Sequence, residues 1–201
     1  ETVSSVTCSL EDILKPTSVA VILDTRDSSL EILDWICEGF SENIEVINYG
    51  VLPSGSMPVL LNHFGHNLGI VISASHNPSE YNGIKLIDEN GSKLQDEIEL
   101  AIESNIQNIS LPNTHTSFKE SKDGFKVYFE FLNQLFDFDL TSFDLVVDSA
   151  NGSAYKIIEK LLDVNDFEFN IIANNPDGKN INLDSGATNI DNLINKLTNG
   201  Q

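Results

Sequence analysis

The stretch LGIVISASHNPSEYNGIKLI, residues 68–87, decides the fold because two aliphatic runs flank a polar loop. The runs at 68–72 and 84–87 have the length and composition of buried strands. Two further aliphatic runs of the same kind lie earlier in the chain, at 19–23 and 44–49. Apolar residues with helical spacing separate or follow these runs, at 30–40, 59–64 and 95–106. This alternation of strands and helices predicts an α/β fold.

The second half of the chain repeats the α/β pattern more briefly. Residues 108–120 carry Pro112 and no sustained period, which indicates a loop or an irregular edge segment that closes the first unit. An apolar stripe then predicts a helix over 122–136. Strands are expected at 145–147 and 169–173, with a strand-to-helix junction after the first of them. Two parallel strands are rarely stable alone, so this second unit is expected to be incomplete.

Composition excludes several classes of function. The 201 residues contain 31 acidic and 11 basic side chains, a formal charge of −20, which would repel nucleic acid and anionic lipid. We find neither a long apolar run that could span a membrane nor a signal peptide, and the chain begins as if in mid-protein. The two cysteines, Cys8 and Cys37, are far apart without metal-ligand spacing, which favours reduced thiols in a cytoplasmic protein.

The polar loop within 68–87 is restricted at both ends. Pro78 disfavours a helical conformation at Asn77, and the pair Asn82–Gly83 favours a tight turn. The loop also follows the carboxyl end of a strand, where α/β proteins commonly bind ligands. We therefore expect its side chains to be presented at the mouth of a sheet.

Three side chains in and beside this loop could do chemistry. Ser75 has a hydroxyl that can carry a phosphoryl group, His76 is a titratable donor, and Lys85 is a cation that could neutralise phosphate or exchange a proton. A purely structural interpretation is the alternative, in which the serines form an ordinary turn, the histidine is a surface residue and the lysine is only a solvent-exposed residue of a strand. Residue types and spacing alone do not decide between the two.

Longer motifs resemble the α-D-phosphohexomutase family. GIVISASHNPSEYNGIKLIDENGSKL, residues 69–94, is similar to the phosphoserine-loop segment of that family in its Ser-His-Asn-Pro core, its Asn-Gly, the lysine two residues later and the following Asp-x-x-Gly turn. Further segments agree in order: DTRDSS (24–29), YGVLPS (49–54), VVDSANGSAY (146–155) and NPDGKNINLDSGAT (175–188). The last of these resembles the phosphoglucosamine mutase branch.

The resemblance implies an organisation for the chain. It implies a phosphohexomutase domain 1 with the phosphoserine loop at 1–120, a linking helix at 121–140 and an incomplete domain 2 at 141–201. The expected fold class is α/β, with a mixed sheet and flanking helices in the first domain, followed by the start of a second, similar α/β domain.

The resemblance also implies roles for the candidate catalytic residues. Ser75 matches the serine that is phosphorylated, gives its phosphoryl group to a sugar monophosphate and takes one back from a sugar bisphosphate. Through that phosphate, Ser75 would also bind Mg²⁺. His76 matches a residue that lines the active site, and Lys85 matches a proposed acid/base or phosphate-contacting lysine.

Other residues of the motif are expected to shape the site. Ser73 is the rival nucleophile, but alignment to the Ser-His-Asn-Pro core selects Ser75 and leaves Ser73 as a hydrogen-bonding residue of the active-site loop. Asn77 and Asn82 are expected to shape the same loop. Asp24 and Arg26 favour a structural ion pair. The oxygen-rich segment 175–188 could suggest a calcium loop, but it lacks EF-hand spacing, and a structural turn is favoured.

The implied function is interconversion of glucosamine 6-phosphate and glucosamine 1-phosphate. The partners expected are a small phosphosugar substrate, with no nucleic acid and no membrane, and a homodimer is left open. Alternatives are a phosphomannomutase or phosphoglucomutase, and a non-catalytic module that binds sugar phosphates or other proteins. The family's Gly-Thr-Asp-Gly-x-Arg-Gly start, its Asp-Gly metal loop and its last domains have no counterpart here, so we expect the 201-residue chain to be inactive alone.

Overall fold

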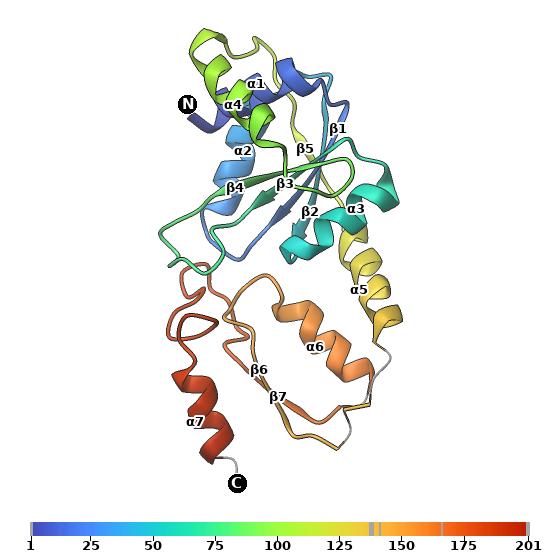
Figure 1. The fold of residues 1–201 in the computed structure, drawn as a ribbon, viewed down its shortest axis with the longest axis vertical. Coiled ribbons are helices and arrows are strands. Elements are labelled where there is room, and N and C mark those ends of the chain that lie inside the picture. Colours follow the sequence, from blue (N-terminus) through green and yellow to red (C-terminus); the bar gives the residue numbers. More distant parts are fainter. Residues whose placement is uncertain (1, 137–138, 141, 166, 200–201) are drawn as a thin grey trace.

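The first unit is a mixed sheet covered by helices on both faces (Figure 1). The computed structural model describes residues 2–136, 139–140, 142–165 and 167–199. The elements of the first unit are α1 (Thr2–Leu14), β1 (Ser18–Leu23), α2 (Ser29–Gly39), β2 (Glu45–Val51), α3 (Met57–Phe64), β3 (Leu68–Ile72), β4 (Ile84–Asp88), α4 (Asp96–Asn105), β5 (Phe118–Glu120) and α5 (Asp123–Leu135). Short 3-10 turns at Ser54–Ser56 and Ile106–Asn108 precede α3 and follow α4.

The sheet has the strand order β4-β3-β1-β2-β5. β4 runs antiparallel to β3, and the other neighbours pair in parallel. Parallel pairing aligns Leu23 at the end of β1 with Ile72 at the end of β3. The carboxyl ends of these two strands, and the loops that follow them, therefore lie together.

Alternation along β1 divides the apolar side chains between two cores. Val19, Val21 and Leu23 pack with α1, α2 and α4 on one face, whereas Ala20 and Ile22 pack with α3 and α5 on the other. All five side chains are at most 5% exposed, as expected for a strand in the middle of a sheet. The predicted α/β class and mixed sheet are confirmed.

Helix α1 was not expected from the sequence, although Val3, Val6, Leu10 and Ile13 recur at helical spacing and pack with the first core. Ser4, Thr7 and Ser9 are fully buried. The Thr7 hydroxyl donates to the Ile36 carbonyl (3.1 Å), and a Cβ at Gly39 would overlap Thr7. Small polar residues beside the apolar stripe thus allow α1 to pack closely on α2.

The edge strand β5 lies in the segment 108–120 that was expected to be irregular. It has three residues and pairs with β2 from Val46 to Asn48. A strand of three residues is too short to show an alternation of apolar and polar residues in the sequence.

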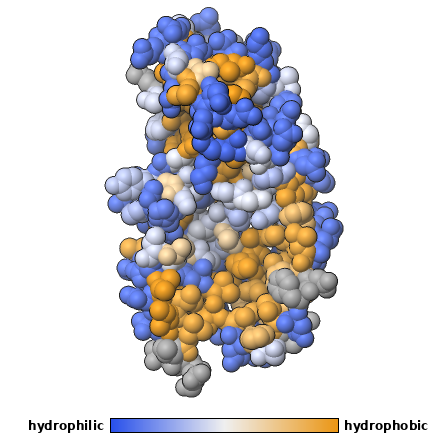
Figure 2. Space-filling view, in the orientation of Figure 1, coloured by the Kyte–Doolittle hydropathy of each residue, from blue (hydrophilic) through white to orange (hydrophobic). Residues whose placement is uncertain are grey.

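The second unit contains β6 (Leu145–Asp148), α6 (Tyr155–Val164), β7 (Phe169–Ile172) and α7 (Asp191–Asn199). β6 and β7 form a parallel pair, as expected, and Ile157 of α6 packs into the core beneath α5. Figure 2 shows apolar side chains gathered over this unit. Its exposed large apolar residues include Phe143, Val164, Leu183, Ile190, Ile194 and Leu197. The domain boundaries stay a prediction, and residues 137–138 of the expected linking helix lie outside the described residues.

Candidate active site

The polar loop of residues 73–83 leaves the sheet at the carboxyl end of β3. Its base is closed by a hydrogen bond from Ser73 N to Gly83 O (2.9 Å). The loop after β1 begins beside it, because Asp24 N donates to Ile72 O (3.0 Å). The site therefore lies where two adjacent parallel strands end, a common ligand position in α/β folds.

Ser75 lies at the exposed tip of this loop with a left-handed backbone, φ 56°. This conformation is uncommon for a serine and requires support from its surroundings. One support is local, because the Ser73 hydroxyl accepts a hydrogen bond from Ser75 N (3.1 Å). The Ser73 hydroxyl therefore takes part in the hydrogen bonding of the loop, and Ser75 is exposed to solvent.

A buried ion pair supports the loop from inside. Arg26 and Asp24 are each 3% exposed, and the guanidinium Nη1 donates to the Asp24 carboxylate. Arg26 Nη2 donates to Asn77 O (2.6 Å) and, at 3.4 Å, to Ser75 O. The expected ion pair is present, and it also holds the backbone of the serine loop.

Asn82 fixes the other end of the loop. Its Nδ2 donates to the hydroxyls of Ser28 (2.9 Å) and Ser29 (3.3 Å), and its Oδ1 accepts from Gly83 N (2.8 Å). Asn77 takes part through its backbone, because its N donates to Ala74 O (3.2 Å). Both asparagines therefore form hydrogen bonds that restrict the conformation of the loop.

His76 and Lys85 are less closely integrated. His76 is exposed beside Ser75. Lys85 is exposed on the edge strand β4, where it pairs in register with Val71. Within the described part of the chain, neither side chain forms a hydrogen bond or ion pair.

Hydrogen bonds connect the second unit to this site. The Thr25 hydroxyl donates to Asn151 O (2.5 Å), and Asp27 N donates to Gly178 O (3.0 Å). Asn182 Nδ2 donates to the carbonyls of both Ser75 and Asn77, at 2.9 Å each. Asn182 is separated from Ser75 by 107 positions, so no local pattern could have predicted that contact.

The segment 175–188 is a hydrogen-bonded turn, as favoured from the sequence. Asp177 Oδ1 accepts from the backbone nitrogens of Lys179 and Asn180, at 2.9 Å each. Asp148 accepts from Gly186 N (2.7 Å), which fastens the turn to the end of β6. Two of the side-chain oxygens that could have suggested a calcium loop are therefore used within the turn, because Asn180 Oδ1 also accepts from Asp177 N (3.0 Å).

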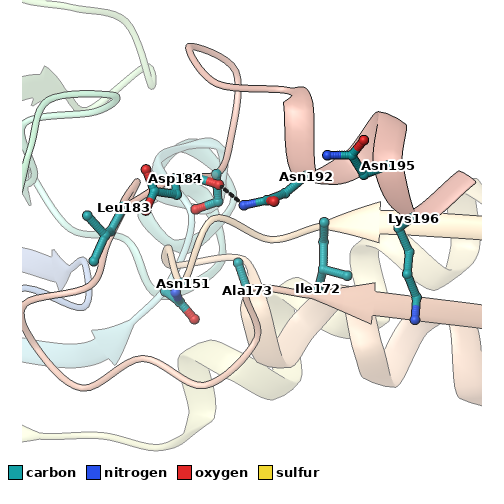
Figure 3. A pocket seen from close by; sticks show the side chains of 9 residues that line it. Asn151, Ile172, Ala173, Leu183, Asp184, Asn192, Asn195 and Lys196 are labelled. Atoms are coloured by element: carbon teal, nitrogen blue, oxygen red, sulfur yellow. Dashed lines mark hydrogen bonds between the residues drawn. The ribbon is translucent and has the colours of Figure 1, made fainter. Parts of the chain in front are cut away.

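A pocket of about 590 Å³ lies beside this turn, between the end of β7 and α7 (Figure 3). Asn192 Nδ2 donates to Asp184 O (2.7 Å) across it, and Lys196 extends along its wall. Ser185 also lines it, with a buried hydroxyl that has no partner in the described ranges. The pocket belongs to the second unit and contains none of the predicted site residues.

The residues present do not form a magnesium site by themselves. Mg²⁺ requires several oxygen ligands in near-octahedral arrangement. No group of three or more His, Cys, Asp or Glu that could hold a metal occurs among residues 2–199, apart from the undescribed positions. No helix in the described ranges has the length and apolar character needed to cross a bilayer.

Comparison with known proteins places this geometry in context. The profile described as "Phosphoglucomutase/phosphomannomutase, alpha/beta/alpha domain I" matches residues 1–113. Phosphoglucosamine mutase from Alkaliphilus oremlandii is 38% identical over 182 residues, covering 87% of this chain and 40% of that protein. The enzyme of the same name from Clostridium kluyveri is 36% identical over 184 residues, covering 88% and 41%. The chain therefore spans about two fifths of the length of these relatives.

The same architecture occurs in solved structures. A putative phosphomannomutase from Thermus thermophilus has a TM-score of 0.74 at 21% identity, over 89% of this chain and 43% of that one. At this identity the likeness concerns the fold, which is the helix-covered mixed sheet described above.

Proposed function

The chain belongs to the phosphoglucomutase/phosphomannomutase family, and from this premise we propose that Ser75 carries the phosphoryl group in a phosphohexomutase reaction. The observation that carries the proposal is the support given to an exposed serine. Its left-handed backbone is held at the ends of β1 and β3 by Arg26 and Asn182. An ordinary exposed turn would not require a buried arginine at its base.

The proposed reaction transfers one phosphoryl group in each direction. The bond between phosphorus and Ser75 Oγ breaks as a hydroxyl oxygen of a hexose monophosphate bonds to phosphorus, and the hydroxyl proton leaves to a base. The resulting bisphosphate reorients and returns its other phosphoryl group to Ser75. His76 and Lys85 are the proposed groups for contacting phosphate and exchanging the proton.

The proposed substrate pair is glucosamine 6-phosphate and glucosamine 1-phosphate. Support comes from the relatives of 36–38% identity, which carry the name phosphoglucosamine mutase. Mg²⁺ would supply positive charge at the transferring phosphoryl group, and only the phosphate on Ser75 is proposed as its ligand here. Free cysteines at positions 8 and 37 support a reducing, cytoplasmic location. A homodimer stays a prediction.

The test assays the polypeptide encoded by the complete gene with glucosamine, mannose and glucose 6-phosphates, Mg²⁺ and catalytic sugar bisphosphate. Ser75→Ala should reduce turnover by at least about a thousandfold, because the group that accepts the phosphoryl is lost. The matched control is Ser73→Ala, which removes only a hydrogen-bond acceptor and should retain turnover within about tenfold. Full activity of Ser75→Ala would show that the nucleophile is wrongly assigned. Turnover by the isolated 201-residue chain would contradict its expected inactivity.

A further inference from the structure

Two side chains from different units donate to the same two carbonyls. Ser75 O and Asn77 O both accept from Arg26 Nη2, at 3.4 and 2.6 Å. The same two oxygens both accept from Asn182 Nδ2, at 2.9 Å each. Arg26 follows β1 in the first unit, whereas Asn182 lies in the turn after β7 in the second.

This arrangement restricts the backbone on both sides of the reactive position. A carbonyl oxygen has two lone pairs, so each can accept from both donors. The Ser75 carbonyl belongs to the peptide unit that follows Ser75, and the Asn77 carbonyl lies two units further on, so fixing both limits rotation of the backbone at Ser75, where φ is uncommon. Arg26 holds these groups from the buried side and Asn182 from the exposed side.

Asn182 is itself anchored in the second unit. Its backbone nitrogen donates to Ala150 O (2.9 Å), at the end of β6. Its φ is 60°, a left-handed conformation that asparagine tolerates better than most residues. Its NH₂ group has two hydrogens, which matches the two carbonyls it contacts. Asn182 is therefore fixed to the second unit by its backbone and contacts the serine loop by its side chain.

We propose that Asn182 is a positioning residue that couples the docking of the second unit to the orientation of Ser75. When the second unit is docked, the loop is held from both sides and the serine is presented in one orientation. When it moves away, these two carbonyls keep only Arg26 of the two donors. The effect on turnover rests on the proposed mutase function, whereas the effect on loop mobility does not.

Two variants isolate the amide donor in the polypeptide encoded by the complete gene. Asn182→Asp keeps the shape and the tolerance for positive φ but replaces the donor by an oxygen that repels both carbonyls. Asn182→Gly removes the side chain without backbone strain. The matched control is Asn192→Ala, because Asn192 Nδ2 also donates to a carbonyl, Asp184 O, but contacts only its own unit.

Hydrogen exchange of the amides in residues 73–78 is the first readout. Ser75 N and Asn77 N both donate within the loop, so their exchange reports its mobility. Both Asn182 variants should exchange faster there by about tenfold, and Asn192→Ala should match the unmodified protein. Unchanged exchange in both Asn182 variants would overturn the proposal, whether or not the protein is a mutase.

Steady-state kinetics is the second readout. Both Asn182 variants should lose about tenfold in kcat, equivalent to about 1.4 kcal/mol, with KM within about twofold, because the substrate sites are unaltered. Equal losses in Asn192→Ala would indicate general destabilisation and refute a positioning role. Faster exchange in a protein without mutase activity would refute the proposed function and still support the coupling.

Discussion

Replacing Arg26 by methionine tests the buried support beneath the serine loop. Methionine fills much of the arginine stem but removes the charge and the donors. Asp24, 3% exposed, would keep two hydrogen bonds, from Arg26 N (3.1 Å) and the Ser29 hydroxyl (3.3 Å), but would lose its counter-charge. A buried carboxylate left unpaired in this way costs about 3–5 kcal/mol.

Urea unfolding of the 201-residue chain measures this cost. The single tryptophan, Trp35, packs against the first core, so its fluorescence reports unfolding of the first unit. With a slope of about 2 kcal/mol/M, the midpoint of Arg26→Met should fall by roughly 1.5–2.5 M. The matched control is Lys119→Ala, which breaks an ion pair with Glu45 whose side chains are 71% and 49% exposed, and should cost less than about 1 kcal/mol.

A double variant separates unpaired charge from lost packing. Asp24→Asn combined with Arg26→Met removes both charges, so it should recover at least half of the stability that Arg26→Met alone loses. Equal destabilisation by the Arg26 and Lys119 variants would refute the role given to burial. Failure of the double variant to recover stability would show that packing, not unpaired charge, dominates.

Two further predictions concern the backbone and pH. Gly178→Ala should lower the free energy of unfolding, measured in urea, by about 1–3 kcal/mol, because φ at Gly178 is 91° and a Cβ there would overlap Asp27. The control Gly152→Ala should lower it by less than about 1 kcal/mol. Equal losses in the two variants would contradict the close approach of Gly178 to Asp27. His66 is buried and contacts the hydroxyls of Ser18 and Tyr49, and its burial lowers the pKa of the imidazole. Below about pH 6.5, the unfolded chain therefore binds more protons than the folded one. Stability should therefore fall from pH 7.5 to 5.5, more steeply than in His66→Gln; parallel pH profiles would contradict the assignment.

The strands that position the site could be predicted because they are buried on both faces. The runs at 19–23 and 68–72 are continuous aliphatic sequences, which parallel central strands require. Helix α1 was missed, although Val3, Val6, Leu10 and Ile13 form an apolar stripe at helical spacing. Residue spacing could not indicate that Ser4, Thr7 and Ser9, beside this stripe, are buried and form hydrogen bonds.

The candidate site was predictable only within one segment. Family motifs select Ser75, and local turn chemistry indicates that Asn77 and Asn82 restrict the loop. The contacts of Arg26 and Asn182 with the loop carbonyls depend on the meeting of three distant segments. Such contacts depend on tertiary packing, which residue spacing does not encode.

The most direct test of the central claim locates the phosphoryl group on the polypeptide encoded by the complete gene. After brief mixing of the dephosphorylated protein with sugar bisphosphate, intact and peptide mass spectrometry would identify the modified residue. We predict one added phosphoryl group on Ser75, lost on addition of hexose monophosphate and absent from Ser75→Ala. A phosphoryl group on Ser73, or on neither serine while the sugar phosphate is still isomerised, would contradict the account.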